Sequence, residues 1–198
     1  MVVLDAEDKI VGRLASDISR KVKDGDLFVD IGANIGNHSI FMAAISNCDV
    51  VSIEPNKHLA TAFSETIKLN NFSKKIDLIE KGIGQNAGHA AFQKEIPNNL
   101  GAQKLGKTNS SNGDIELTTL DDLNFDNSLK LLKIDVEGME MEVLRGGEKT
   151  IEKDLPIIYI EGKTKEELMS IKNFLAPFGY RYKKTFNASP THLFSANS

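Results

Sequence analysis

The beginning of the chain passes from a helical to a strand-like pattern of apolar residues. Within residues 1–25, apolar side chains recur every four positions among Asp, Lys and Arg, which predicts an amphipathic leading helix. A glycine ends this pattern, and residues 27–31 form a nearly continuous apolar run typical of a strand covered on both faces. The residues that define the two patterns are Ile10, Leu14, Ile18 and Val22 for the helix, and Leu27, Phe28, Val29 and Ile31 for the strand.

The alternation of helix and strand continues to residue 79. A helical pattern starts at Asn37, and a second short apolar run ends just before Glu54. A helix is predicted over residues 57–70 and a third strand over residues 76–79. Strands separated by single helices are typical of a parallel sheet with crossover helices. We therefore predict an α/β fold, a doubly wound sheet with helices on both faces.

A segment rich in Asn, Gly and Ser interrupts this pattern. Residues 93–113 read QKEIPNNLGAQKLGKTNSSNG, and their turn-forming residues argue against a long regular element. A loop of this length inside a compact domain is uncommon unless it has a function. We interpret residues 93–113 as a loop or lid on the substrate side, with a tolerated surface insertion as the alternative.

The C-terminal half returns to the α/β pattern and ends in a predicted antiparallel hairpin. Such an edge is common on otherwise parallel sheets, so the whole chain, residues 1–198, is predicted to form one domain. The predicted elements are a short strand at 115–117, strands at 129–134 and 156–160, helices at 139–145 and 165–175, and the hairpin strands 180–186 and 191–195.

The composition of the chain bears on its binding partners, on disulfide formation and on its location in the cell. The formal net charge is -4, with acidic and basic residues interspersed, so a nucleic-acid partner is not expected. Cys48 is the single cysteine, so no internal disulfide can form. No signal-peptide pattern and no apolar run of about 18 residues occurs, which predicts a cytoplasmic protein without a membrane span. A homo-oligomer stays possible.

The loop after the first strand has the composition of a ligand-binding turn. Gly32-Ala33-Asn34-Ile35-Gly36 joins the strand to a helix, and small residues there let a ligand approach the backbone. Asp30 before the first glycine disfavours a diphosphate and suits the ammonium of a methionine moiety. Glu54, at the end of the second strand, is placed to accept ribose hydroxyls. The plain alternatives are a helix-capping Asp and a surface Glu.

The sequence resembles the FkbM family of methyltransferases through FVDIGANIGNHSIFMA, VSIEPN, LTTLDDL, LLKIDVEGMEMEVLRGG and IIYIEG, in that order from residue 28 to 162. The resemblance implies the class I methyltransferase (Rossmann-like) sheet, with strand order 3-2-1-4-5-7-6 and S-adenosyl-L-methionine at the carboxyl ends of strands one and two. The residues it assigns to the cofactor are Asp30, Gly32, Ala33, Asn34, Gly36 and Glu54.

The KIDVEG block matches the same family at Asp135, Glu137 and Gly138. A hydroxyl acceptor loses a proton during methyl transfer, and a carboxylate or histidine within reach can take it. We rank Asp135 first as this base, and also as a cofactor contact, with His38 and Glu161 behind it. One alternative is that Asp135 and Glu137 only cap the next helix. Another is that Asp135, Glu137 and Glu161 bind Mg²⁺, although we predict no metal.

Two parts of the site are less defined by the sequence. The segment EKGIGQNAG lacks the signature of an acidic residue followed by a small one that many class I enzymes use for the adenine amine, so we assign adenine to Gly82, Ile83 or the backbone. Glu137, Asn99 and Gly101 are predicted to face the acceptor.

The predicted function is methyl transfer from S-adenosyl-L-methionine to a hydroxyl of a small metabolite or carbohydrate. Methylation of nitrogen or of a carboxylate uses the same donor geometry and stays an alternative. A nicotinamide-dependent oxidoreductase is a second alternative, disfavoured by Asp30 and by the missing middle glycine. A scaffold that binds the cofactor without catalysis is a third, against which the complete KIDVEG block argues.

Overall fold

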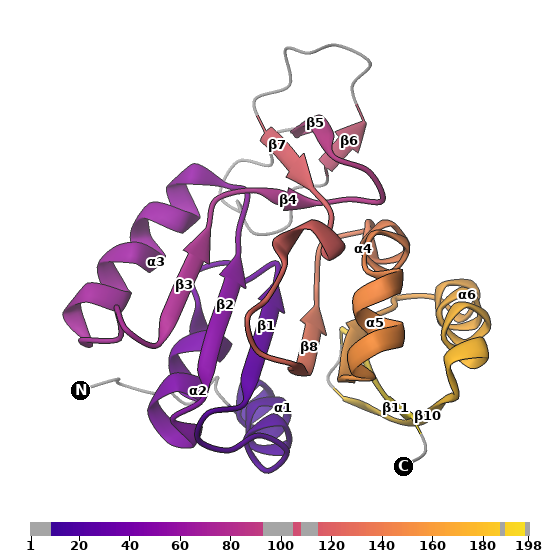
Figure 1. Ribbon diagram of the computed structural model, residues 1–198, viewed down its shortest axis with the longest axis horizontal. Helices are drawn as coiled ribbons and strands as arrows, with labels where there is room; N and C mark the ends of the chain where they lie inside the picture. The colour runs from indigo at the N-terminus through magenta and orange to yellow at the C-terminus, as the bar shows by residue number, and fades with distance from the viewer. Residues whose placement is uncertain (1–8, 93–104, 108–114, 187–188, 197–198) are drawn as a thin grey trace.

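The computed structural model describes residues 9–92, 105–107, 115–186 and 189–196. Seven strands form the main sheet in the order β3-β2-β1-β8-β9-β11-β10 (Figure 1). The first five are parallel, whereas β11 runs antiparallel to both of its neighbours. The strands of the main sheet are β1 (Leu27–Ile31), β2 (Asp49–Ile53), β3 (Ile76–Ile79), β8 (Leu129–Ile134), β9 (Ile157–Glu161), β10 (Tyr180–Phe186) and β11 (Thr191–Ala196).

This arrangement confirms the predicted fold class, the strand order and the C-terminal hairpin. Parallel strands covered on both faces need apolar residues on both, and all five side chains of β1 are buried. The helices of the described chain are α1 (Lys9–Ser19), which precedes β1, and α2 (Asn37–Ser46), α3 (Lys57–Leu69), α4 (Glu140–Gly146), α5 (Glu148–Asp154) and α6 (Lys165–Leu175), with 3-10 turns at Asp121–Leu123 and Ala176–Phe178.

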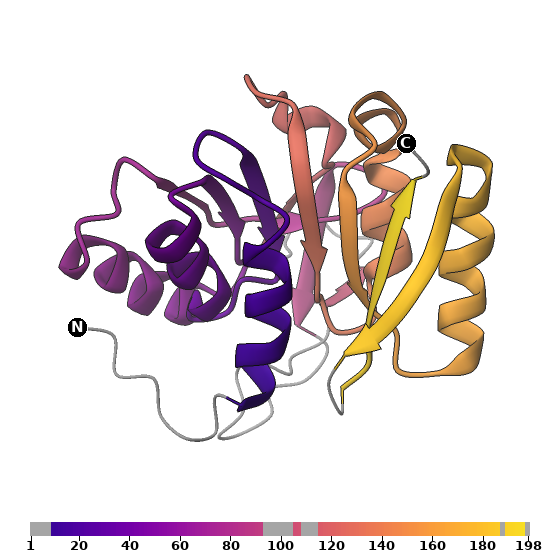
Figure 2. The same ribbon diagram turned by 90° about the horizontal axis from the view of Figure 1, so that it is seen from below.

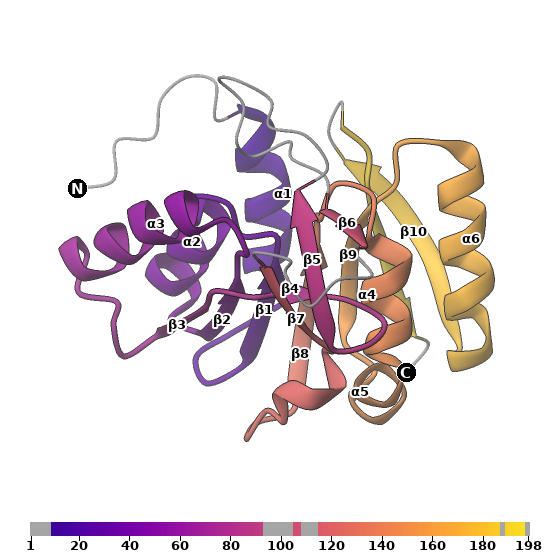
Figure 3. The ribbon, with the colours of Figure 1, turned by 90° about the horizontal axis from the view of Figure 1, so that it is seen from above.

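Two apolar cores lie on the two faces of the main sheet. One contains Phe28 of β1 and Phe63 of α3 and is covered by α1, α2 and α3. The other contains Val29 of β1, Val143 of α4 and Ile171 of α6 and is covered by α4, α5 and α6. Figure 3 shows α1, α2 and α3 together on one side of the sheet, and Figure 2 gives the opposite view.

A second, smaller sheet was not predicted as a unit. It has the order β4-β7-β5-β6 and lies beyond the carboxyl ends of the main strands (Figure 1). Only β7 corresponds to an expected strand, and β6 lies inside the segment interpreted as a loop or lid. The rest of that segment falls outside the described residues. The strands of this sheet are β4 (Gly82–Ile83), β5 (Gly88–Phe92), β6 (Leu105–Lys107) and β7 (Ile115–Thr118).

Two helix predictions also need correction. The leading helix ends at Ser19 because the chain turns before β1, where Lys23 donates its amide hydrogen to the Asp26 carboxylate at 3.0 Å. Helix α5 was missed, since Ile151 is its single buried residue and gives no periodic signal. None of the helices in the described part of the chain has the length and hydropathy that a membrane span requires.

Candidate active site

The glycines of the loop after β1 are required by its geometry. Gly32 has φ 78°, and a Cβ atom there would lie 1.8 Å from the backbone oxygen of Asp135. Gly36 has φ 84°, and its Cβ would lie 2.0 Å from the ring of Phe63. The amides of Gly32 and Ala33 both donate to the Ile53 carbonyl, at 2.9 and 3.0 Å. The loop is therefore held tightly between β2 and β8, as a backbone that closely approaches a ligand must be.

A cavity of about 370 Å³ lies between this loop, the ends of β2 and β8, and the second sheet. This volume is in the range typical of sites for small molecules and cofactors. The cavity is lined by Ile31, Gly32, Ala33, Asn34, Ile35, Asn37, His38, Ile53, Glu54, Pro55, Asn56, Leu59, Lys81, Gly82, Ile83, Phe92, Lys133, Asp135, Val136, Glu137 and Met139.

Glu54 lies at the cavity wall with both carboxylate oxygens engaged. It accepts hydrogen bonds from the amides of Asn34 and Asn56, both at 2.8 Å. Burial raises the pKa of this carboxyl, although the two amide hydrogen bonds oppose the shift. Each oxygen retains a second lone pair for a ligand hydroxyl. The plain alternative of a surface Glu is wrong, because the residue is buried and Asn56 caps α3.

Beside the cavity, a buried row of polar side chains crosses the middle of the main sheet. Lys133 of β8 donates to one Asp30 oxygen at 2.9 Å, and Ser39 donates to the other at 2.8 Å. Ser52 of β2 donates in turn to Ser39 at 2.8 Å. Asp30 and Lys133 are 0% and 3% exposed. The carboxylates of Asp30 and Asp135 outweigh the effect of burial and raise the pKa of Lys133, so the group is a buried ion pair.

Asp30 does not cap a helix and does not line the cavity. Helix α2 begins at Asn37, and within the described chain the Asp30 carboxylate accepts hydrogen bonds only from the side chains of Lys133 and Ser39, so the capping alternative is wrong. A ligand ammonium in the cavity would meet Lys133 before Asp30, because Lys133 lines the cavity and binds the Asp30 carboxylate. The predicted direct contact between Asp30 and a ligand ammonium is therefore blocked by Lys133. Among the described residues, Lys133 is the charged group of this row that lines the cavity.

His38 is the second residue of α2 and also faces the cavity. Its Nε2 atom is buried and has no hydrogen-bond partner in the described structure. Burial, reinforced by the positive charge of Lys133, lowers the pKa of His38 to about 4. The imidazole is therefore neutral near pH 7.

The turn after β8 directs two acidic side chains toward the same region. Glu137 and Gly138 have φ 55° and 102°, and the amides of Val136 and Gly138 donate to Glu140 at 3.3 and 3.1 Å. Among the described residues, the N-cap Met139 gives no side-chain cap and no amide of α4 donates to Asp135 or Glu137, so the idea that these two residues cap it is wrong. Left-handed backbone at a non-glycine residue is costly and often marks a functional turn.

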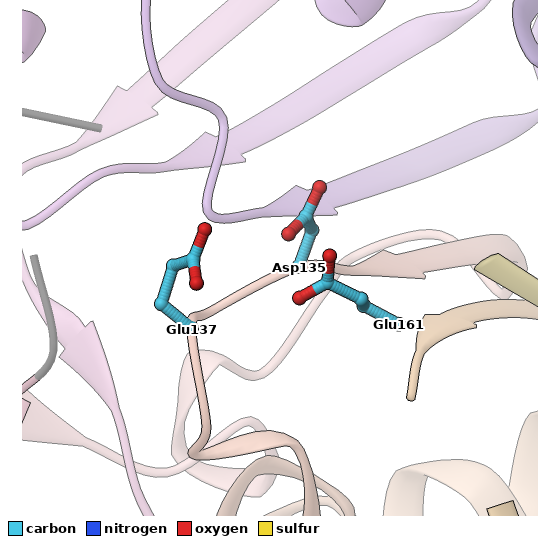
Figure 4. A group of neighbouring side chains, drawn as sticks. All are labelled: Asp135, Glu137 and Glu161. Carbon is cyan, nitrogen blue, oxygen red and sulfur yellow. The ribbon is translucent and has the colours of Figure 1, made fainter. Parts of the chain in front are cut away.

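Asp135, Glu137 and Glu161 form an acidic cluster at the ends of β8 and β9 (Figure 4). One oxygen from each lies within 4.8 Å of the others. The ammonium of Lys163 contacts Glu137 at 2.5 Å and Glu161 at 3.2 Å, and Ser189 donates to the other Glu161 oxygen. Burial raises the pKa of Glu161. Lys163 thus supplies positive charge where the alternative placed Mg²⁺.

The structure brings most of the predicted site residues to one cavity. Asp30, Gly36 and Glu161 do not line the cavity. Glu161 lies next to Asp135, which does line it. Asn99 and Gly101 lie outside the described residues. Those that line the cavity are Gly32, Ala33, Asn34, His38, Glu54, Gly82, Ile83, Asp135 and Glu137.

Among the lining residues that the sequence analysis did not assign to the site are Lys133, Phe92 and Lys81. Lys133 is a charged residue within an apolar strand, and this was a readable signal, since a buried lysine needs a partner. Phe92 and Lys81 gave no comparable signal, because Phe92 belongs to the unpredicted second sheet. Lys81 pairs with Glu116 of β7 at 2.6 Å beside Gly82 and Ile83.

Solved structures with the same fold include several methyltransferases. An FkbM methyltransferase from Methylobacillus flagellatus is 20% identical with a TM-score of 0.66, covering 87% of this chain and 44% of its own. An rRNA methylase from Streptococcus thermophilus is 11% identical with a TM-score of 0.60, covering 100% of both chains. A SAM-dependent O-methyltransferase from Thermotoga maritima is 12% identical with a TM-score of 0.57, covering 100% of this chain and 68% of its own.

This chain therefore spans less than half the length of the Methylobacillus protein. Comparison with curated proteins gives no match. The sequence model of the methyltransferase FkbM domain, however, matches residues 30–182, which include the loop after β1, Glu54 and the turn after β8. The chain belongs to the FkbM family of methyltransferases.

Proposed function

We propose that this protein transfers the methyl group of S-adenosyl-L-methionine to a hydroxyl oxygen of a small metabolite or carbohydrate. The observation that carries the proposal is that the glycine loop, Glu54 and two proton acceptors, Asp135 and His38, line one cavity. A donor and a hydroxyl held in the same cavity need mainly alignment for transfer.

The residues of the cavity fit this donor. Gly32 lets the loop pack directly against the Asp135 backbone at the cavity wall, and Glu54 offers oxygen atoms for ribose hydroxyls. Gly82 and Ile83, with Phe92 near them in the lining, are assigned to the adenine end. When bound, the donor supplies a methyl carbon on a positively charged sulfur, which is a good leaving group.

The protein's own contribution to the chemistry is to take up the acceptor's proton. Asp135 is our first choice, because its side chain is 39% exposed and opens into the cavity. His38 is the second, since the neutral imidazole also faces the cavity. Glu161 ranks behind both because Lys163 and Ser189 occupy its oxygens.

Glu137 supports a polar acceptor, and Asn99 and Gly101 stay proposals for the same role. Carboxylates beside the cavity accept hydrogen bonds from sugar hydroxyls and repel phosphates. The acidic cluster and the net charge of -4 therefore favour a small hydroxylated acceptor over a nucleic acid.

The first experiment is calorimetric titration of the protein with S-adenosylmethionine, S-adenosylhomocysteine and NAD. We expect the two adenosyl ligands to bind and NAD not to. Glu54→Gln should weaken their binding about ten- to a hundredfold, as loss of a charged hydrogen-bond acceptor does. Glu152→Gln, on the exposed face of α5, should have no effect. Binding of NAD alone would overturn the proposal.

The second experiment follows transfer of a labelled methyl group to panels of hydroxyl, amine and carboxylate acceptors. Asp135→Asn should lower kcat about a hundredfold or more by loss of the proton acceptor, whereas Asp126→Asn, at an exposed position, should not. Labelling of amines or carboxylates without labelling of alcohols would refute the choice of acceptor and leave the donor assignment intact.

A further inference from the structure

Lys133 has more hydrogen-bonding capacity than the described structure uses. An ammonium has three N–H donors, and the structure gives the Lys133 ammonium one hydrogen bond, to Asp30 at 2.9 Å. The distance to Asp135 is 3.8 Å, an ion pair rather than a hydrogen bond. The side chain is 4% exposed and still lines the cavity, so its remaining donors can be used only by neighbouring buried groups or by a ligand.

The position of Lys133 distinguishes it from the other lysine of the cavity. Lys81 pairs with Glu116 beside β4, the part assigned to adenine. Lys133 lies on β8 opposite Asp30 in the strand register, two residues before Asp135. The backbone oxygen of Asp135 lies 1.8 Å from the position that a Cβ atom on Gly32 would occupy. Lys133 is therefore at the glycine-loop end of the cavity, where the amino-acid part of the donor would lie.

We propose that Lys133 binds the carboxylate of the donor's methionyl group, and that Asp30 is the buried counter-ion that holds Lys133 in place. This inference rests on the proposed function and deepens it. It replaces the expected direct contact between Asp30 and the ligand ammonium. A charge-assisted hydrogen bond from a desolvated ammonium to a carboxylate is among the stronger polar contacts.

The neighbouring charges suit both ends of an α-amino acid. Asp30 already receives hydrogen bonds at both oxygens, from Lys133 and from Ser39. Asp135 is 3.8 Å from the same ammonium. A ligand that carries a carboxylate beside an ammonium thus meets a positive group with a negative group next to it. A ligand without the carboxylate would leave the Lys133 donors without a partner, which is costly in a buried site.

The test compares three ligands that share the adenosine part: S-adenosylhomocysteine, its decarboxylated analogue, and methylthioadenosine. The unmodified protein should prefer S-adenosylhomocysteine to the decarboxylated analogue by about ten- to a hundredfold in Kd. If it binds both equally, the assignment of Lys133 is overturned without any variant.

Variants of Lys133 test whether this residue causes the preference for S-adenosylhomocysteine over its decarboxylated analogue. Lys133→Met should abolish the preference while leaving the Kd for methylthioadenosine unchanged. Because Lys133→Met leaves Asp30 buried without its partner, the double variant Asp30→Asn with Lys133→Met provides a neutral pair that should fold. Lys81→Met is the matched control and should keep the preference.

The outcomes separate this inference from the proposed function. Retention of the full preference in the double variant would overturn the role of Lys133 while the donor assignment stands. Failure of the unmodified protein to bind any of the three ligands would overturn both. Loss of affinity for all three ligands equally in the double variant would show a merely structural role for Lys133.

Discussion

Two charged groups near the carboxyl ends of the main strands differ in how far water can reach them. The Asp30–Lys133 pair is almost completely buried, and Ser39 holds it in place from α2. In the acidic cluster, Glu137 and Glu161 pair with Lys163, whose side chain is 44% exposed. A desolvated ion pair costs much to break, whereas an exposed one contributes little because water replaces it. The first group can therefore fix the geometry of the site, and the second can adapt to an acceptor.

The largest expected effect comes from breaking the buried pair. Lys133→Met leaves an unpaired carboxylate in the interior and should lower the free energy of unfolding by about 3–5 kcal/mol, measured by urea denaturation. Lys163→Met is the matched change at the half-exposed lysine and should cost clearly less than Lys133→Met, because water can reach the Glu137–Lys163 pair. Equal losses in the two variants would contradict the contrast between the groups.

A somewhat smaller effect is expected from the backbone beside the buried pair. Gly32→Ala puts a Cβ on a residue with φ 78°, 1.8 Å from the Asp135 oxygen. We expect a loss of about 3 kcal/mol in stability, together with loss of binding to adenosyl ligands. Gly88→Ala adds the same atom in open space in the second sheet and should change stability by about 0.5 kcal/mol or less. Urea denaturation of both variants checks this prediction. If Gly32→Ala left the stability unchanged, the close packing of Gly32 against the Asp135 backbone would be refuted.

The smallest of the three effects concerns pH. The folded-state pKa of His38 is about 4, below its ordinary 6.5, because the residue is buried near Lys133. Between these values the unfolded chain binds more protons, so stability falls as pH falls from 6.5 toward 4. The loss attributable to His38 should reach roughly 2–3 kcal/mol. His38→Gln should remove this part of the pH dependence and the exposed His89→Gln should not, as denaturation at several pH values will show.

The parts of the structure with local sequence signals were predictable. The apolar run of β1, the glycines after it and the four-residue spacing in α1 each require only nearby residues. In contrast, β5 consists of GHAAF, whose Gly and Ala have low strand propensity, so its pairing with β7 decides its structure. The site follows the same rule. Asp30 could be located from its loop, but its partner Lys133 is 103 positions away in the sequence, and this distance hid their ion pair.

The way the second sheet joins the main one has a consequence for how such proteins diversify. The strand that leads into it, β4, pairs in parallel with β7, the strand that leads out, so that Gly82 lies opposite Leu117. The two points of departure and return are thus adjacent in space. Evolution can lengthen, shorten or exchange the intervening chain at a small entropic cost and without moving β3 or β8. A lineage can therefore change the residues that this sheet contributes to the cavity, such as Phe92, while the strands that carry Glu54 and Asp135 stay in place.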